Sequence, residues 1–390
     1  MEHLLNPIVK KISISAIRDI GNKVDQDPSI INFTIGKPDF VTPDSILEAG
    51  KRAIDERKIS YTHNAGVLEL RQAVSDFVKR HYQLMYDPED EILITTGASE
   101  GLDVAFRTIL EPGDEVILPA PIYPGYEPLI RMCNAVPVFV DTRKNDCKIT
   151  PQLIKENLTE KTKCVLLPYP SNPTGTILNM EELEEIANFL RGKDIFIVSD
   201  EIYSELTYDV KHVSIASLPG MKDQCIVVNG LSKSHAMTGW RVGYTLAPRS
   251  VTKEMFKVHA YICVCASSIS QYAAIEALKQ DLPEVEIMRQ EYKKRRDFIY
   301  DCIMDMGLDA IKPDGAFYIF VSIEKTGLKS NEFINQLVEK EKVAVIPGYG
   351  FSEYGEGYIR LSYACSMEDL KEGMRRIKRF VDSLKEVKVN

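Results

Sequence analysis

Lys233 lies between two serines in the segment from Asn229 to Tyr244, and Arg241 follows it eight positions later. A lysine amine can form a Schiff base with an aldehyde, and a guanidinium group can hold a phosphate. Both groups are needed to bind pyridoxal 5′-phosphate (PLP), a cofactor that carries an aldehyde and a phosphate. A lysine taken singly is most often a solvated loop residue. The hypothesis of a PLP site therefore depends on what the rest of the chain supplies.

Further polar residues follow strand-like apolar runs, at the strand ends where open α/β sheets bind ligands. Gly97, Ala98 and Ser99 open an amphipathic helix, so backbone N–H groups and the Ser99 hydroxyl can receive a phosphate. Asn172, in a turn after another such run, can point its amide at a cofactor hydroxyl. Each feature also has a plain structural interpretation, as an N-cap serine without a ligand or as an ordinary turn.

Asp200 and Tyr203 follow a third apolar run. A carboxylate that faces a pyridine nitrogen keeps that nitrogen protonated, which lets the PLP ring absorb carbanion electrons. The Tyr203 hydroxyl could donate a hydrogen bond to the phenolic oxygen of the cofactor and so tune its imine. Acidic residues at a strand end can also be simply solvated, so these two residues gain meaning only together with Lys233. The combination favours PLP-dependent catalysis.

Composition points to small-molecule chemistry. The chain has 390 residues, with 57 acidic against 48 basic residues and a net charge of -9. No basic block dominates, so neither a nucleic acid nor a membrane surface is expected as a partner. No apolar run of about 18 residues and no secretory leader are present, so the protein is expected to be cytoplasmic.

Cysteine and histidine spacing predicts no metal site. The eight cysteines include no CxxC pair, and the six histidines include no HExxH pair. Cys263 and Cys265 alternate in an apolar stretch, where core packing is the favoured interpretation over a metal site. All eight are expected to be free thiols.

Alternation of β-branched runs with helical patterns predicts an α/β fold whose large domain has a mostly parallel seven-stranded sheet flanked by helices. Helices are expected at 99–110 and 180–191, the second with a capping box of Asn179 and Glu182. The expected strands are 91–96, 115–119, 136–141, 164–170, 195–201, 225–230 and 242–247.

The pattern of strand-like and helix-like segments along the chain predicts three regions. Residues 1–45 are expected to form an N-terminal arm and part of a small domain, and residues 46–285 the large cofactor-binding domain. Residues 286–390 begin with a long charged helix, continue with strand-like pieces (AFYIFVSI, VAVIP and YIRLSYA) and end in an amphipathic helix. They are expected to complete a smaller α+β domain.

Three motifs in order, SNPTG (171–175), SDEIY (199–203) and SKSHAMTGWRVGY (232–244), resemble the class I/II aminotransferases, PLP enzymes of fold type I. The resemblance covers essentially the whole chain and is to the subgroup that contains the bacterial aspartate and aromatic aminotransferases. It implies Lys233 as the Schiff-base residue, Asp200 as the pyridinium partner, and Asn172 and Tyr203 as partners of the phenolic oxygen. It further implies a phosphate site of Arg241, Ser99 and the Ala98 amide, an aromatic stack at Tyr123, and substrate contacts at Gly36, Asn172 and Arg360.

The family also implies a homodimer with shared active sites, because Tyr61 resembles the tyrosine that reaches the phosphate of the neighbouring subunit. Arg360 would hold the substrate α-carboxylate with its guanidinium fork. One departure is Gly230, which occupies a position where many relatives have a phosphate-binding serine, so Ser232 or backbone donors are expected to contribute instead. Cis peptide bonds are expected before Pro121 and Pro173.

The substrate is suggested by MEHLLNP (1–7), TTGASE (95–100) and PIYPGYEP (121–128), which resemble the N-acetyl-L,L-diaminopimelate aminotransferases of Gram-positive bacteria. These enzymes exchange an amino group between glutamate and an acetylated oxo-pimelate, with N-acetyl-L,L-2,6-diaminopimelate and 2-oxoglutarate as the other pair, in lysine biosynthesis. Residues 347–357 and the segment around Ile17 and Arg18 are expected to border the distal part of the pocket.

Two other classes of function stay open at this point. On the same scaffold, the chain could be an aromatic or aspartate aminotransferase or a PLP-dependent carbon–sulfur β-lyase. A PLP-sensing regulator or binding protein is less favoured. A regulator needs an appended basic DNA-binding domain, and no such domain is expected here, since the first residues are predicted to form the arm.

Overall fold

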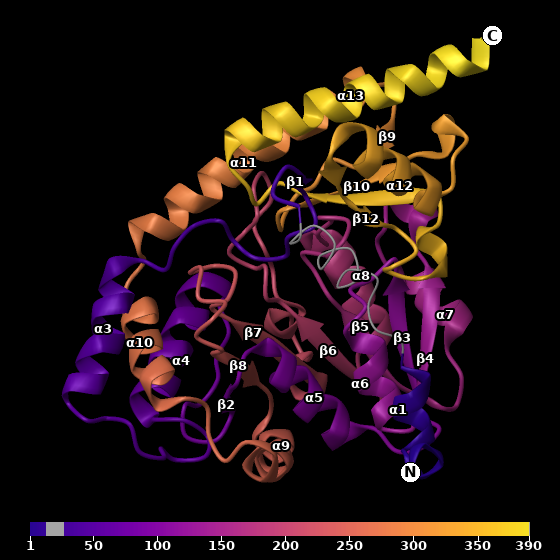
Figure 1. Ribbon diagram of the computed structural model, residues 1–390. Coiled ribbons are helices and arrows are strands. Elements are labelled where there is room, and N and C mark those ends of the chain that lie inside the picture. The colour runs from indigo at the N-terminus through magenta and orange to yellow at the C-terminus, as the bar shows by residue number, and fades with distance from the viewer. Residues whose placement is uncertain (13–26, 390) are drawn as a thin grey trace.

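A computed structural model describes residues 1–12 and 27–389 of the chain. Its centre is one sheet with the strand order β2-β8-β7-β6-β5-β3-β4 (Figure 1). The strands are β2 (Ile92–Thr95), β3 (Glu115–Ala120), β4 (Val136–Asp141), β5 (Thr162–Leu167), β6 (Phe196–Asp200), β7 (Cys225–Gly230) and β8 (Gly243–Leu246). Each lies on a predicted strand segment, and the predicted α/β class is confirmed.

The sheet is mostly parallel, as predicted, with one reversed strand. Strands β3, β4, β5, β6 and β7 run parallel, whereas β8 pairs antiparallel with both β7 and β2. The reversal of β8 makes β2 parallel to β7 on its other side. The carboxyl ends of β2, β5, β6 and β7 therefore meet at one edge of the sheet, where ligands bind in open α/β sheets.

Alternate residues of each central strand face two different apolar layers. In β5, Val165 and Leu167 belong to one hydrophobic cluster and Cys164 and Leu166 to another. Helices cover both faces, which explains why these strands are apolar on both sides. One layer holds α4 (Leu68–Tyr82), α7 (Pro151–Asn157), α8 (Met180–Leu190) and α10 (Ser268–Lys279), with α3 (Asp44–Asp55) beside α10, and the other holds α5 (Ala98–Ile109), α6 (Tyr126–Met132) and α9 (Arg249–Ile262).

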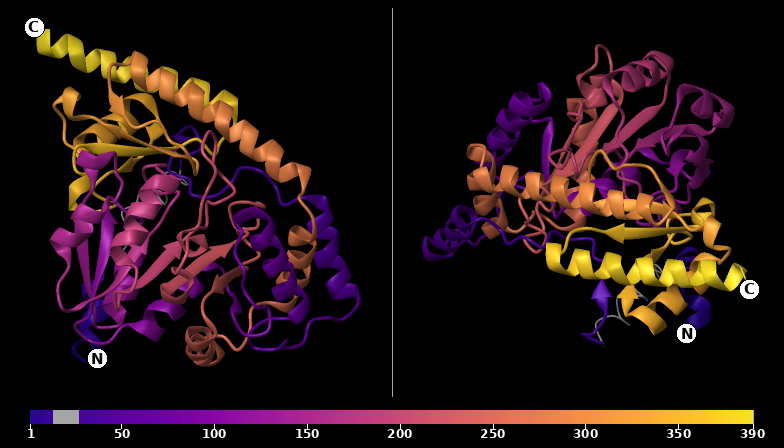
Figure 2. Two further views of the ribbon diagram at one scale, coloured as in Figure 1. Left: turned by 180° about the vertical axis from the view of Figure 1, so that it is seen from behind. Right: turned by 90° about the horizontal axis from the view of Figure 1, so that it is seen from above.

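A second, antiparallel sheet has the order β12-β13-β10-β9. The long helices α11 and α13 contact each other and lie along this sheet (Figure 2). The apolar cluster beneath them includes Ile299 of α11, Ile319 of β10 and Phe380 of α13. The bounds are α11 (Pro283–Asp305), β9 (Asp309–Ala310), β10 (Tyr318–Ser322), α12 (Ser330–Glu341), β12 (Ile346–Pro347), β13 (Tyr358–Ser362) and α13 (Met367–Val389).

The strand predicted at 343–347 is divided between two sheets. Its first part, β11 (Val343–Ala344), pairs in parallel with β1 (Ile31–Asn32), and its second part, β12, pairs with β13. A continuous apolar run does not reveal which partner each half takes, because both halves are buried.

The N-terminal region has two different locations. The short helix α1 (Pro7–Lys11) contacts α6 beside the large sheet, whereas β1 joins β11 near the small sheet. The division into domains at residues 45 and 285 stays a prediction. Ile17 and Arg18 lie outside the described residues. Within the described ranges, no helix is long and apolar enough to cross a membrane.

The predicted capping box of α8 is present. The Asn179 side chain accepts a hydrogen bond from the Glu182 N–H at 2.9 Å, and the Glu182 carboxylate accepts from the Asn179 N–H at 2.8 Å. This cap sets the start of the helix that connects β5 to β6, and so the chain between Asn172 and Asp200.

We expect Asn179→Ala to lower the free energy of unfolding by about 1 kcal/mol, because the substitution leaves the Glu182 N–H without its acceptor. Urea unfolding followed by the fluorescence of the single tryptophan measures the change. The control is Glu185→Ala, at an exposed position on the same helix, which should stay within about 0.5 kcal/mol of the parent protein. Equal effects of the two substitutions would contradict the role of the cap.

Candidate active site

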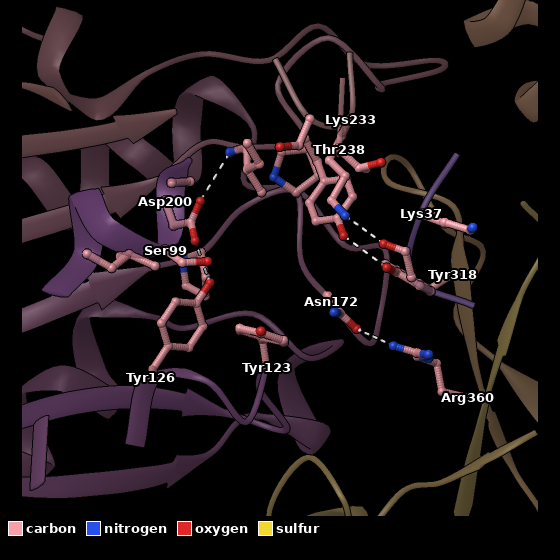
Figure 3. Close-up of a pocket in the computed structure, with 18 of the residues that line it drawn as sticks. Lys37, Ser99, Tyr123, Tyr126, Asn172, Asp200, Lys233, Thr238, Tyr318 and Arg360 are labelled. Carbon is pink, nitrogen blue, oxygen red and sulfur yellow. Dashed lines mark hydrogen bonds between the residues drawn. The ribbon is translucent and has the colours of Figure 1, made fainter. Parts of the chain in front are cut away.

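A cavity of about 380 Å³ lies at the carboxyl edge of the large sheet, a volume within the range of small-molecule sites. Figure 3 shows Asp200 with Tyr126 on one side of it and Arg360 with Asn172 on the other. All of the predicted site residues except Tyr61 line this cavity: Gly36, Ala98, Ser99, Tyr123, Asn172, Asp200, Tyr203, Ser232, Lys233, Arg241 and Arg360. Residues far apart in sequence are brought together by the strand ends.

Lys233 follows β7 closely, and its side chain is partly buried. Its Nζ donates a hydrogen bond to the Gly36 carbonyl at 2.6 Å, so the glycine backbone lies against the amine. Burial lowers the pKa of Lys233 to about 8, and the positive charges of Arg241 and Arg360 act in the same direction. A substantial fraction of the amine is therefore neutral, and nucleophilic, at a pH near 8.

Asp200 is the last residue of β6 and is buried. Its carboxylate accepts hydrogen bonds from the Tyr126 hydroxyl at 2.8 Å and from the Ile202 N–H at 3.1 Å. Burial raises the pKa of Asp200 to about 6, and the hydrogen bonds from Tyr126 and Ile202 limit the rise. At neutral pH the group is mostly a buried carboxylate, which favours a cationic or N–H partner in the cavity.

The turn between β2 and α5 brings donors together for an anion. Ala98 and Ser99 begin α5, so their N–H groups lie at its positive N-terminal end. The Arg241 guanidinium lies against this turn, and a Cβ on Gly97 would come within 2.5 Å of its Nη2. Arg241 forms no ion pair with a carboxylate of residues 1–12 or 27–389. The arrangement is an anion site with an unneutralised guanidinium.

Ser232 and Gly230 differ in their relation to the cavity. Ser232 is buried and lines it, as expected for a residue that contributes to the phosphate site. Gly230 lies outside its lining, at the end of β7 and opposite Gly243 of β8, where a Cβ would come within 3.0 Å of the Gly243 Cα. A serine at Gly230 would therefore require a shift of the neighbouring backbone.

Arg360, on β13, is almost fully buried. Its guanidinium donates to the Asn172 Oδ1 at 3.1 Å and to the Thr34 carbonyl at 2.7 Å, and its Nε has no partner among the described residues. The aromatic ring of Tyr318 lies 4.4 Å from its central carbon. Burial lowers the pKa of Arg360. Because no carboxylate in the described part of the chain pairs with it, this cation is suited to an anionic ligand.

Tyrosines complete the walls. The Tyr203 hydroxyl lies 2.9 Å from the Tyr318 hydroxyl, and burial raises the pKa of Tyr203. The Tyr123 ring is edge-on to the Tyr126 ring, with centroids 5.4 Å apart, and Tyr123 is 40% exposed at the mouth. Tyr61 does not reach this cavity and is 84% exposed. The cis bonds predicted before Pro121 and Pro173 are present, with a third before Pro170.

Sequence reasoning missed several lining residues. Tyr126 lies three positions after Tyr123, and a signal for it existed in the PIYPGY motif, since both side chains follow the end of β3. Tyr318 and Thr238 carried no comparable signal, because a tyrosine in an apolar strand and a threonine in a loop are ordinary. The glycine-rich segment 347–357 reaches the site through Phe351, whose ring lies 5.1 Å from the Arg360 guanidinium carbon.

The family model for aminotransferase class I and II matches residues 28–377, so the chain belongs to this family. A probable N-acetyl-LL-diaminopimelate aminotransferase of Bacillus subtilis is 57% identical over 98% of this chain and 96% of that protein. Aromatic-amino-acid aminotransferase 2 of Thermococcus litoralis is 39% identical over 98% of this chain and 99% of the relative. Aspartate aminotransferase of Thermus thermophilus, solved with maleate, is 34% identical, with a TM-score of 0.92 over 96% of this chain and 99% of that one.

Members of this family depend on PLP, and the chain is a PLP-dependent aminotransferase. The cavity fits the cofactor by the chemistry of its donors. An anion site beside Gly97 suits the phosphate, a buried carboxylate suits the pyridine nitrogen, and a lysine of lowered pKa suits the aldehyde. The Nε of Arg360, without a partner among the described residues, leaves that guanidinium able to take a second anion.

We expect Tyr126→Phe to lower the rate of the amino-acid half-reaction about tenfold, because it removes a hydrogen bond that stabilises the Asp200 carboxylate. The pKa of Asp200 should then rise above about 6. Single-turnover absorbance of the bound cofactor with a fixed amino acid measures the rate. Tyr349→Phe, outside the cavity lining, is the control, and a Tyr126→Phe rate within about twofold of its value would exclude this role.

In the cofactor-free protein, the rate of covalent capture of PLP should follow the neutral fraction of Lys233. Because the pKa of Lys233 is about 8, the rate should rise with pH up to that value and level off above it. With an ordinary lysine, whose pKa is about 10.4, the rate of PLP capture would continue to rise through pH about 10. Stopped-flow absorbance across the pH range measures the profile, and a midpoint near the ordinary value would show that burial does not act on this amine.

Proposed function

We propose that this aminotransferase exchanges an amino group between glutamate and an acetylated 2-oxo-pimelate, with N-acetyl-L,L-2,6-diaminopimelate and 2-oxoglutarate as the other pair, in lysine biosynthesis. This choice of substrate is supported by the 57% identity to the Bacillus subtilis relative, a probable enzyme of this reaction by its name. The aromatic-amino-acid aminotransferase of Thermococcus litoralis is 39% identical. The alignment extends over almost the full length of both chains, so it spans the segments that form the walls of the cavity.

Arg360 and Asn172 bind and orient the amino acid in this proposal. The buried Arg360 guanidinium, whose Nε has no partner in the described part of the chain, receives the α-carboxylate. Asn172 fixes the plane of the guanidinium through the 3.1 Å hydrogen bond. The Gly36 backbone lies beside the amine of Lys233 and bounds the substrate on that side. The α-carbon is thereby held next to the lysine.

Lys233 carries the proton. PLP, when bound, supplies an aldehyde that links covalently to amino groups and a ring that absorbs the electrons released at the α-carbon. With a pKa of about 8, the Lys233 amine can take the α-proton and release it again, because its two protonation states are balanced near pH 8. The Asp200 carboxylate, with Tyr126 beside it, holds negative charge where the pyridine nitrogen is expected. Tyr203 supplies its hydroxyl to the phenolic oxygen.

The active form in this proposal is a homodimer with shared sites. Tyr61 and Tyr261 are 84% and 94% exposed, and Ile262 and Val264 are also exposed. The Asn64 amide donates to the Val264 carbonyl at 2.7 Å, so the loop that carries Tyr61 lies beside the end of α9 and the residues that follow it. Large apolar side chains gathered on one surface are typical of an interface. Tyr61 would contact the phosphate site of the partner subunit, and the dimer would be cytoplasmic.

A second candidate is an aspartate or aromatic aminotransferase. It is favoured by the Thermococcus litoralis relative and by the Thermus thermophilus structure with maleate, a dicarboxylate. Both candidates use Arg360 in the same way, so they differ only in the distal part of the substrate. The choice between them therefore requires a comparison of substrates.

The decisive experiment compares amino donors by their single-turnover conversion of the bound chromophore. We expect N-acetyl-L,L-diaminopimelate and glutamate to react at least about tenfold faster than aspartate or phenylalanine at equal concentration. Arg360→Ala should lower kcat/KM for every donor about 100-fold, since all of them carry an α-carboxylate.

Two outcomes would contradict the proposal. Faster conversion of aspartate or phenylalanine would favour the second candidate. Pyruvate and ammonia released from cystathionine without a keto acid would identify a carbon–sulfur β-lyase instead.

A further inference from the structure

A buried polar pair lies beside the turn between β2 and α5, where the phosphate of PLP is expected, and plays no part in the chemistry described above. Glu100 is in the first turn of α5, next to Ser99, and His259 of α9 is fully buried. The His259 Nδ1 lies 2.7 Å from the Glu100 Oε1. Sequence spacing gave no sign of this pair, because 159 positions separate its members.

The hydrogen bonds of His259 determine the charge of the pair. Its Nε2 lies 2.8 Å from the Asn64 carbonyl, which can only accept, so this nitrogen carries a proton. The Nδ1 and the Glu100 oxygen then need a second proton between them. Whether that proton belongs to the imidazole or to the carboxyl group, the pair as a whole is neutral.

Glu100 is connected to the phosphate site through Thr96. The Glu100 Oε2 accepts a hydrogen bond from the Thr96 N–H, and the Thr96 carbonyl accepts one from the Arg241 Nη2 at 3.4 Å. Glu100 therefore helps to place Thr96, the residue whose carbonyl group contacts the guanidinium. Without His259, however, Glu100 would be a buried anion beside a site that binds another anion, an arrangement that costs affinity.

The other end of the pair holds the loop that carries Tyr61. His259 donates to the Asn64 carbonyl, and the buried Gln271 donates to the Thr62 hydroxyl at 3.0 Å and accepts from the Val67 N–H at 2.8 Å. In the homodimer proposed above, this loop would contact the phosphate site of the partner subunit. That part of the inference rests on the proposed dimer, whereas the contacts within one chain do not.

We propose that His259 is a positioning residue for cofactor retention. It neutralises Glu100, so that Glu100 can hold the backbone of Thr96, whose carbonyl group contacts Arg241. It also fastens the Asn64 loop to α9. His259 itself does not line the cavity. Its loss should weaken the binding of PLP, and removal of the Glu100 charge should restore much of that binding.

Cys263 belongs to the same cluster and supplies the competing explanation. Its Sγ donates to the Glu100 Oε1 at 3.1 Å and lies 3.7 Å from the His259 Nδ1, so the three side chains could also ligate a metal ion. A metal site needs all three ligands, whereas the positioning pair does not need the thiol. Substitutions can therefore separate the two explanations.

The test is equilibrium dialysis of the holoenzyme against graded PLP, with the bound chromophore as the readout. We expect His259→Leu to weaken PLP binding about tenfold. Glu100→Gln alone should stay within about threefold of the parent, because an amide can accept from the Thr96 N–H and donate to the His259 Nδ1. The double variant Glu100→Gln with His259→Leu should bind PLP more tightly than His259→Leu alone.

Cys263→Ala is the matched control and should bind PLP like the parent protein. Parent-like binding by His259→Leu would overturn the inference. So would equal weakening in Glu100→Gln, His259→Leu and Cys263→Ala together with loss of copurified zinc, which would establish a metal site instead. Circular dichroism of each variant checks folding, and because no substrate is used, the result is independent of the substrate comparison.

Discussion

Positive charge gathered in a partly buried cavity is the constraint on which the structure of the site depends. Lys233, Arg241 and Arg360 all line one cavity, and Asp200 is the carboxylate that lines it with them. Cations gathered in a cavity repel one another, and burial of Arg360 adds a desolvation cost, so anionic ligands should stabilise this site. In the function proposed above, the phosphate of the cofactor and the α-carboxylate of the substrate supply the negative charge that these cations need.

The fold satisfies this constraint by the geometry of strand ends. Parallel strands put the residues after β2, β5, β6 and β7 at one edge, and β13 of the small sheet brings Arg360 to the same place. The cost of burying the charges is met by packing elsewhere, because the strands carry apolar residues on both faces. Rigid strands hold the charged groups more precisely than loops alone would.

The sequence predicted the large sheet well because its signals are local. Runs of β-branched residues mark a strand wherever it pairs, and the motifs around Asn172, Asp200 and Lys233 mark strand ends. Features that depend on partners distant in the chain were not predictable in this way. The split of residues 343–347 between two sheets, the hydrogen bond from Tyr126 to Asp200, and the meeting of Glu100 with His259 all depend on tertiary packing.

The segment that contains Thr34 and Gly36 has an unusual place among these contacts. Its carbonyl groups accept from Arg360 and from Lys233, and a few residues earlier the chain pairs with β11 through β1. Lys233 and Arg360 are also the groups expected to bind cofactor and substrate, so these ligands and the two carbonyl groups compete for the same donors. The contacts of the segment that follows β1 therefore depend on whether the cavity is occupied, and they should weaken when it is filled.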